Sequence, residues 1–446
     1  MTSNSTHLRL AEKQHSRAAA CPARWTLLLL VGCLTAAPAR AAEAEKVADM
    51  PPPEASSALK ADRRRAAHRQ RRMIMNNDGN DARRLPQDVP HSREMFLRQR
   101  TSPLVGSHVD AIFHCTGQFN LYRHHSSETE LKKNAGSDED WGWELGTDGP
   151  DVLETMVDFG HRHEIEVFWS MRMNDTHDAK YDWCMSQWKK DHPQLLVGKP
   201  GQEFTYGRAN WKGRWSSLNY AMPEVRDKVF RILEDVATRY DVDGLELDFF
   251  RHPVYFRPQL IGEPVTQSHC DMITDLLRRI RRMVDSVAAG RGRPLLISVR
   301  VPDSAGYAKS IGLDVERWLQ EDLIDLLVGG GYFHLQPWEN LVALGHRYDV
   351  PVYPCLSASR LGFATALADP FNDRKVSGMA TWRGEAARAW EAGADGIYVF
   401  NCFNPHDPIF RELGDPVLLK TLEKEYQVDV GPIGHWLKDA SQFIKH

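Results

Sequence analysis

The feature that most constrains the fold is a long alternation of short apolar runs with helical patterns, which begins at Arg71. The runs are rich in β-forming residues and have the length of barrel strands. Eight such units in one unbroken series predict a parallel sheet closed on itself: an α/β chain with a (β/α)8 TIM barrel and long βα loops. The expected strands are Met73–Asn76, Val109–Cys115, Glu166–Met171, Gly244–Phe249, Leu295–Val301, Leu323–Val328, Val350–Cys355 and Gly396–Phe400.

Two of the intervening helices can be placed closely. Pro223 opens the first, and an apolar stripe marks its buried face. The second carries a similar stripe, with Gly290 at the position just beyond its C-terminus. The stripes are Val225, Val229, Ile232, Leu233, Val236 and Tyr240 in the first helix, and Ile273, Leu276, Leu277, Ile280, Val284 and Val287 in the second. An open, doubly wound sheet is the structural alternative, but no Gly-x-Gly-x-x-Gly motif follows the first strand.

The N-terminus has the pattern of an export signal. Basic residues precede the apolar run Trp25–Leu34, and Ala39-Arg40-Ala41 supplies small residues for a signal peptidase. The run is about ten residues long, whereas a membrane-spanning helix needs about twenty. We therefore expect residues 1–41 to be a signal peptide and the protein to be exported, periplasmic or secreted. The sequence Leu30-Val31-Gly32-Cys33 resembles a lipoprotein box, so the alternative is a lipid anchor at Cys33.

The rest of the chain divides around the barrel. Residues 42–70 contain Met50-Pro51-Pro52-Pro53 and Arg63-Arg64-Arg65, which predict a linker with a solvated basic helix. The barrel is expected over residues 71–425 and a C-terminal tail over 426–446. The formal net charge of the chain is -4, so no overall basic field attracts nucleic acid. No nucleic-acid partner is expected, and membrane contact is expected only through Cys33.

Polar side chains gather where the predicted strands end, and the strand starts carry far fewer of them. In (β/α)8 barrels the active site is built at this carboxyl end. We expect most of these residues to contact substrate and two of them, Asp175 and Asp303, to be candidates for catalysis. The full set is Asn76 and Asp78 after the first strand, Arg172, Asn174, Asp175 and His177 at the third, Arg251 after the fourth, Arg300 and Asp303 at the fifth, Tyr332 after the sixth, and Asn401 after the eighth.

The fourth strand, Gly244-Leu245-Glu246-Leu247-Asp248, is the sharpest feature. Because side chains alternate along a strand, Glu246 and Asp248 share one face, about 6.6 Å apart along the chain. Leu245 and Leu247 then face the surrounding helices. Two carboxylates therefore point into the barrel, Asp248 at its mouth and Glu246 one layer deeper. Arg172 and Arg300 lie on the flanking strands, and Glu246 is expected to pair with one of them, because a buried acid is costly without a partner.

Paired carboxylates at a barrel mouth are what glycoside hydrolysis needs, because one protonates the leaving oxygen while the other attacks or activates water. Asp248 is the predicted nucleophile or general base, and Glu246 supports it. Asp303 is the first choice for the partner acid and Asp175 the second. The alternative is a buried ion-pair network with no chemistry. The Gly-x-Ser-x-Gly, P-loop and His-Glu-x-x-His motifs are absent, which argues against serine-hydrolase, nucleotide and zinc-protease functions.

Two segments carry a family resemblance. Residues 218–226, Leu-Asn-Tyr-Ala-Met-Pro-Glu-Val-Arg, and residues 239–251, which end in Asp-Gly-Leu-Glu-Leu-Asp-Phe-Phe-Arg, resemble the glycosyl-hydrolase-like 10 family. Asp314-Val315-Glu316-Arg317-Trp318 and Gly393-Ala394-Asp395-Gly396-Ile397 are similar to later parts of the same pattern. The resemblance spans about residues 71–425. It implies an exported bacterial barrel related to glycoside hydrolases.

The fourth strand also resembles the Asp-Gly-x-Asp-x-Asp-x-Glu strand of the chitinase family, with Glu246 and Asp248 at the two later Asp positions. Phe250 stands where that family has its catalytic Glu, which argues against its substrate-assisted chemistry. We therefore expect an exported glycosidase that acts on a polysaccharide or oligosaccharide without a cofactor or a metal. The alternatives are a catalytically silent barrel that binds glycans and a metal-dependent hydrolase that uses His177 and nearby acids.

Overall fold

The structure is a computed structural model, and it describes residues 57–82, 89–133, 140–202, 214–365, 376–426, 430–431 and 436–445. The chain divides into the units Met1–Pro51 and Pro52–His446, and the described residues all belong to the second. The predicted signal peptide, with Cys33, and the first part of the predicted linker lie outside the described residues. Among those residues, no helix has the length and apolar character needed to cross a membrane.

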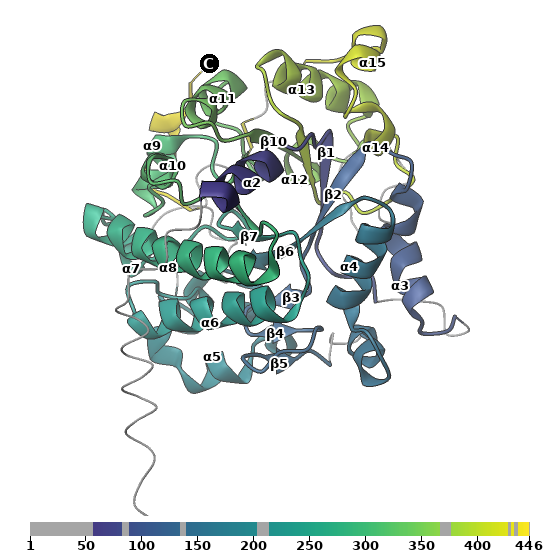
Figure 1. Cartoon of the computed structure of the whole chain (residues 1–446). Helices are drawn as coiled ribbons and strands as arrows, with labels where there is room; N and C mark the ends of the chain where they lie inside the picture. The colour runs from purple at the N-terminus through teal and green to yellow at the C-terminus, as the bar shows by residue number, and fades with distance from the viewer. Residues whose placement is uncertain are drawn as a thin grey trace, which may run out of the picture. The chain divides into compact units, whose positions relative to one another are not determined.

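Eight parallel strands close into a barrel, which confirms the predicted fold class. Their order around the barrel is β1-β11-β10-β9-β8-β7-β6-β2, so each neighbours the next barrel strand in sequence and the last closes on the first (Figure 1). The strands are β1 (Met73–Asn77), β2 (Val109–His114), β6 (Glu166–Arg172), β7 (Gly244–Asp248), β8 (Leu296–Val301), β9 (Leu326–Gly329), β10 (Val352–Ser357) and β11 (Ile397–Phe400). All eight predicted strands are present, with ends shifted by a few residues.

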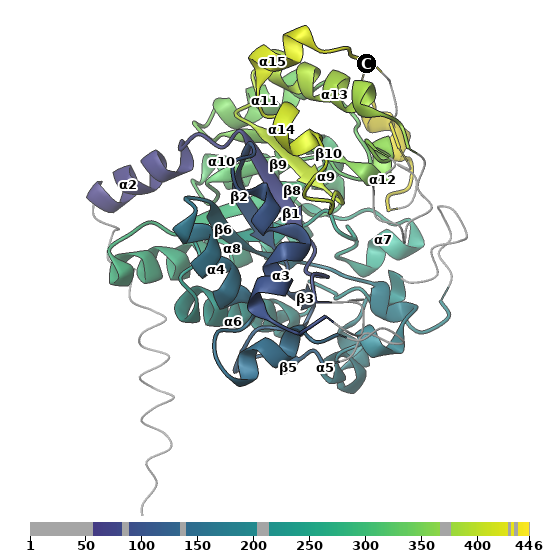
Figure 2. The same ribbon diagram turned by 90° about the vertical axis from the view of Figure 1, so that its right-hand side faces the viewer.

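Helices surround the barrel, and shorter elements fill the loops (Figures 1 and 2). Those described are α2 (Ser57–Ala67), α3 (Arg93–Arg100), α4 (Val152–Arg162), α5 (Gln187–Asp191), α6 (Pro223–Arg239), α7 (Arg257–Ile261), α8 (Gln267–Arg291), α9 (Ala305–Ser310), α10 (Val315–Gln320), α11 (Trp338–His346), α12 (Ala358–Leu361), α13 (Met379–Glu391), α14 (Ile409–Glu412) and α15 (Pro416–Thr421). A small sheet of β3 (Gly117–Gln118), β4 (Leu121–Tyr122) and β5 (Glu130–Leu131) lies beyond β2. Short 3-10 helices cover Ser102–Leu104, Gly142–Thr147, His177–Ala179, Asp182–Cys184, Pro193–Leu195, Arg214–Ser216 and Ala440–Phe443.

The helix predictions hold with one correction. The apolar stripe of α6 is buried from Val225 to Tyr240, as its spacing predicts. The placement of Gly290 just beyond α8 is wrong, because the helix continues to Arg291. Gly292 ends it instead, in the left-handed region at φ 67° that favours glycine. An exposed glycine inside the last turn evidently does not stop a helix whose other face is packed.

Two apolar layers follow from the alternation of side chains along the strands. Outward side chains, including Leu245 and Leu247, pack against the helices in one large core. Inward side chains form a separate cluster inside the barrel. Its members are Ile74, Ala111, Phe113, Phe168, Leu296, Leu326, Val328, Tyr353, Cys355, Tyr398 and Phe400, joined by Ala67. The interior is thus a packed core, and the polar residues of β7 interrupt it.

The helix α2 covers the barrel end at which the strands begin. Its Ala67 belongs to the barrel's inner cluster, and the buried Arg71 donates to Glu166 of β6 at 2.5 and 3.0 Å. Arg63 is 6% exposed and pairs with Asp325 at 3.3 Å. The prediction of a solvated basic helix is therefore wrong for Arg63. Figure 2 places α2 on one side of the strands and α7 and α12, which follow strand ends, on the other.

Candidate active site

The carboxyl end of β7 is held by its neighbours in the predicted register. In the strand register, Asp248 lies opposite Arg172 of β6 on one side and Arg300 of β8 on the other. The Asp248 carboxylate binds the Arg300 guanidinium twice, with Nε 3.0 Å from Oδ1 and Nη2 2.6 Å from Oδ2. Oδ1 also accepts the backbone N–H of Phe250 at 2.9 Å. These two hydrogen bonds make a bidentate ion pair at the barrel mouth, and both of its partners are almost fully buried.

Glu246 lies one layer deeper, but the prediction that it pairs with Arg172 or Arg300 is wrong. Its Oε1 accepts the hydroxyl of Tyr398 at 2.8 Å. Tyr398 belongs to β11, which lies opposite β7 in the closed order, so this bond crosses the barrel. Burial, together with the nearby charge of Asp248, raises the pKa of Glu246. A carboxyl with a raised pKa needs no cation to be tolerated in the interior.

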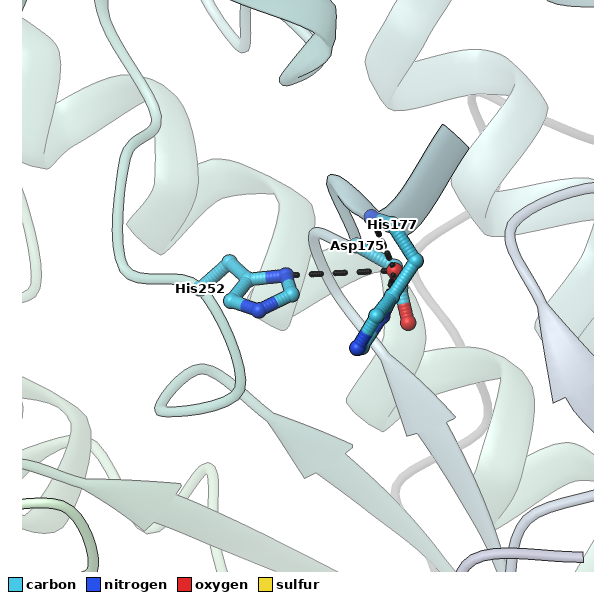
Figure 3. A group of neighbouring side chains, drawn as sticks. All are labelled: Asp175, His177 and His252. Carbon is cyan, nitrogen blue, oxygen red and sulfur yellow. Dashed lines mark hydrogen bonds and ion pairs between the residues drawn. The ribbon is translucent and has the colours of Figure 1, made fainter. Parts of the chain in front are cut away.

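A second cluster forms beside this pair, from the loops after β6 and β7. Arg172 donates to Asp175 Oδ2 at 2.8 Å, and His177 Nδ1 lies 2.6 Å from Asp175 Oδ1. His252 Nδ1 lies 3.8 Å from that same oxygen (Figure 3). Burial alone would raise the pKa of Asp175, but His177 and Arg172 hold it well below its usual range. We call Asp175, His177 and His252 the histidine–aspartate cluster.

The histidine–aspartate cluster could hold a metal ion, because its three ligand atoms lie within 4.8 Å of one another. Two histidines and a carboxylate suit zinc or iron. However, the backbone N–H of Thr176 donates to His252 Nδ1 at 2.9 Å, and the positively charged Arg172 donates to Asp175 Oδ2. A metal ligated through His252 Nδ1 would have to replace the Thr176 hydrogen bond, and a metal on Asp175 Oδ1 would lie near the Arg172 guanidinium that binds Oδ2 of the same carboxylate. The geometry therefore fits an Asp–His hydrogen-bonded pair better than a metal site.

Asp303 occupies a different environment at the end of β8. Its Oδ2 accepts the backbone N–H groups of Leu335 and Gln336, at 2.7 and 2.9 Å. Its Oδ1 finds no donor among the residues that the structure describes. Burial raises the pKa of Asp303 to about 6, against the opposing effect of the two N–H groups. A carboxyl that holds its proton near neutral pH can serve as a general acid.

Asp78 follows the first strand, β1, in a turn whose next residue has to be glycine. Asn77 accepts the N–H of Gly79, whose φ is 76°, and a Cβ on Gly79 would lie 1.7 Å from the carbonyl oxygen of Cys115. Asp78 is paired with Arg100 of α3 at 2.5 Å. Burial would raise the pKa of Asp78, but the nearby arginines hold it well below its usual range.

The remaining predicted residues divide by role. Asn174 donates to Leu218 and Val254 carbonyls and accepts the Leu218 N–H, so a substrate contact would need this network to open. Asn401, in the left-handed region at φ 59°, accepts from Arg251 at 3.4 Å. Asn76 is buried at the end of β1.

Tyr332 is partly exposed at the mouth, and its ring meets Phe400 edge-on at 5.7 Å. The buried Trp436 stacks on Tyr332 at 5.5 Å. This tryptophan lies in the segment expected to be a tail, so part of that segment packs against the barrel mouth. Sequence reasoning missed Trp436, Phe400 and Arg100; the inward alternation of β11 was the one signal that could have revealed Phe400.

A family model described as glycosyl hydrolase-like 10 matches residues 128–267, a stretch that holds β6, α6 and β7. This match is shorter than the span expected from the sequence. No curated protein matches the chain.

Several solved structures are similar to it. Alpha-L-fucosidase isoenzyme 2 from Paenibacillus thiaminolyticus has 13% identity and a TM-score of 0.46, over 79% of this chain and 49% of that one. The chain thus spans about half the length of this protein. The PgaB (BpsB) glycoside hydrolase domain from Bordetella bronchiseptica has 11% identity and a TM-score of 0.46, over 74% and 94% of the two chains. A glycoside hydrolase family 18 N-acetylglucosaminidase from Paenibacillus barengoltzii has 13% identity and a TM-score of 0.40, over 78% and 99%.

The family match contains the strand with both predicted carboxylates, and it bears out the resemblance read from the sequence. The chain therefore folds as a glycoside-hydrolase-like barrel, and its residues 128–267 match the model of the glycosyl hydrolase-like 10 family.

Proposed function

We propose that this protein is an exported glycoside hydrolase that acts on a polysaccharide, with Asp248 as nucleophile or general base and Asp303 as general acid. The observation that carries the proposal is the contrast between these two carboxyls on neighbouring strands. Asp248 is ion-paired with Arg300. Asp303 has no such cation: burial raises its pKa to about 6, and its Oδ1 has no hydrogen-bond donor among the described residues. Glycosidases divide acid and base roles between two carboxyls through such a difference in environment.

In this mechanism Asp303 protonates the glycosidic oxygen that leaves, while Asp248 attacks the sugar or activates water. Glu246 supports Asp248 from the layer below. Arg172, Arg251, Asn401 and Tyr332 line the same end of the barrel and are proposed to contact the glycan. The histidine–aspartate cluster is proposed to bind sugar hydroxyls through His177, whose side chain is 40% exposed. Export, to the periplasm or the medium, rests on the leader pattern, with an anchor at Cys33 as the alternative.

The experiment is a screen of the purified protein against a panel of polysaccharides, read by the release of reducing ends. On a substrate that is cleaved, the rate should fall above about pH 6, as Asp303 loses its proton. Asp303→Asn should lower the rate and abolish this fall. The matched control is Asp349→Asn, an exposed carboxyl at the opposite end of the barrel, which should leave the profile unchanged. An unaltered pH profile in Asp303→Asn would reject Asp303 as the acid.

A second candidate is a catalytically silent barrel that binds glycans. It is favoured by one observation: both oxygens of Asp248 are engaged by Arg300, and the residue is 2% exposed. Measurable glycan binding with no product after prolonged incubation would support this candidate over hydrolysis.

A further inference from the structure

Arg251 reaches across the mouth of the barrel. It follows β7 by three residues, and its guanidinium lies 5.2 Å from the centre of the Phe400 ring on β11, on the opposite side of the closed order. Its Nη1 is 3.4 Å from Asn401 Oδ1, which is a long contact. The residue is 7% exposed, and its Nε has no acceptor among the residues that the structure describes. A strong donor is thus buried at the mouth with its hydrogen-bonding capacity largely unused.

Three other arginines at this end of the barrel each have a carboxylate of their own. The pairs are Arg100 with Asp78 at 2.5 Å, Arg172 with Asp175 at 2.8 Å and Arg300 with Asp248 at 2.6 Å. Among the described residues, no carboxylate lies within ion-pair distance of Arg251. Asp78 lies near enough for Arg251 to help lower its pKa, but Asp78 is already paired with Arg100, so Arg251 has no carboxylate of its own.

An unpaired guanidinium is strongly unfavourable in a buried position unless something else compensates it. A ligand that brings an anion would supply that compensation. The Phe400 ring lies under the Arg251 guanidinium, and the ion-paired Arg300 guanidinium lies 3.9 Å from the centre of the same ring. The unused Nε is itself buried, so the side chain has to turn toward an incoming group; a planar carboxylate or a sulfate group can then bind the guanidinium through two parallel hydrogen bonds. Tyr332, edge-on to the same Phe400 ring, is partly exposed beside it.

We propose that Arg251 is the anchor for a negatively charged group, a carboxylate or a sulfate ester, on the glycan that this barrel binds. The substrate is then an acidic polysaccharide. The glycan part of this inference rests on the proposed function, whereas the anion site at Arg251 does not. Asn401, in a left-handed conformation at the end of β11, donates to Ser359 Oγ at 2.7 Å, and its amide oxygen lies 3.4 Å from Arg251 Nη1.

The first test measures binding by NMR titration with three probes: glucuronate, glucose 6-sulfate and glucose. The wild type should bind at least one of the anionic probes about tenfold more tightly than glucose, as expected for a charge-assisted hydrogen bond. Arg251→Gln should abolish the preference, and Arg251→Lys should restore part of it. Arg347→Gln, which removes an exposed guanidinium, should keep it. No preference in the wild type, or a preference that survives in Arg251→Gln, would overturn the proposal.

The second test needs no ligand. Arg251→Met keeps the stem that packs near Phe400 and removes an uncompensated charge, so the melting temperature should stay the same or rise. Arg172→Met is the matched control: it breaks a buried ion pair and should lower the melting temperature. An equal fall in both variants would mean that Arg251 is already paired in solution, against the proposal. If the anion preference depends on Arg251 and no polysaccharide is cleaved, the proposed function fails and the anion site stands.

Discussion

The ion pair between Asp248 and Arg300 should make a large and cooperative contribution to stability. Arg300 is fully buried and Asp248 is 2% exposed, so a change to either one leaves the other charge without compensation. Arg300→Met or Asp248→Asn should each cost about 3–5 kcal/mol in the free energy of unfolding. The double variant removes both charges, and its cost should fall short of the sum of the two single costs by about 2 kcal/mol or more.

The assay is urea unfolding of the wild type, both single variants and the double variant at pH 7, with thermal unfolding beside it. An entropy of unfolding of about 2.1 cal/mol/K per residue gives about 0.8 kcal/mol/K for the unit Pro52–His446. Each single variant should therefore melt about 4–6 °C below the wild type. Single costs that simply add in the double variant would refute the ion pair. Because Asp248→Asn carries this cost, its activity has to be measured well below its melting temperature.

Three further results are expected. Burial and the charge of Asp248 raise the pKa of Glu246 above its usual 4.5, so the folded state loses stability as the pH rises past 4.5. In urea unfolding, Glu246→Gln should therefore have the same stability as the wild type at pH 4 and a higher stability at pH 8. Equal stability of the two proteins at both pH values would count against a raised pKa. A chelator should leave the activity and the melting temperature unchanged, because hydrogen bonds already satisfy the histidine–aspartate cluster; a loss restored by zinc would instead support a metal-dependent hydrolase. Mass spectrometry of protein recovered from its host should find a mature terminus near Ala42 or an acyl group on Cys33, and an intact Met1 terminus on cytoplasmic protein would contradict export.

The barrel could be predicted because its signals are local. The length of each apolar run and its β-forming residues indicate a strand. The alternation of side chains along β7 then places Glu246 and Asp248 on the inner face, and this inference needs no information about the neighbouring strands. The pairing of Arg172 and Arg300 with the end of β7 follows from the order of parallel strands. Boundaries were less certain: Leu323 and Ile324 continue an apolar run, yet they precede β9, which begins at Leu326.

Contacts between distant parts of the chain could not be predicted in this way. Glu246 lies beside strands that carry arginines, but its partner Tyr398 is 152 positions away on the opposite wall. Whether a side chain meets its neighbour or the far wall depends on the tilt of the strands, which the sequence does not display. The burial of Arg63 has the same origin, because its partner Asp325 lies far along the chain.

The central claim is that Asp248 takes part in the cleavage of a glycosidic bond. The direct measurement compares the turnover of the wild type, Asp248→Asn and the Asp349→Asn control on a polysaccharide that the wild type cleaves. The comparison is made at a temperature where circular dichroism finds all three folded. Turnover by Asp248→Asn should fall by about a thousandfold or more, since the loss of a nucleophile or base removes most of the catalysis, while the control keeps its rate. Near-normal turnover by folded Asp248→Asn would contradict the claim.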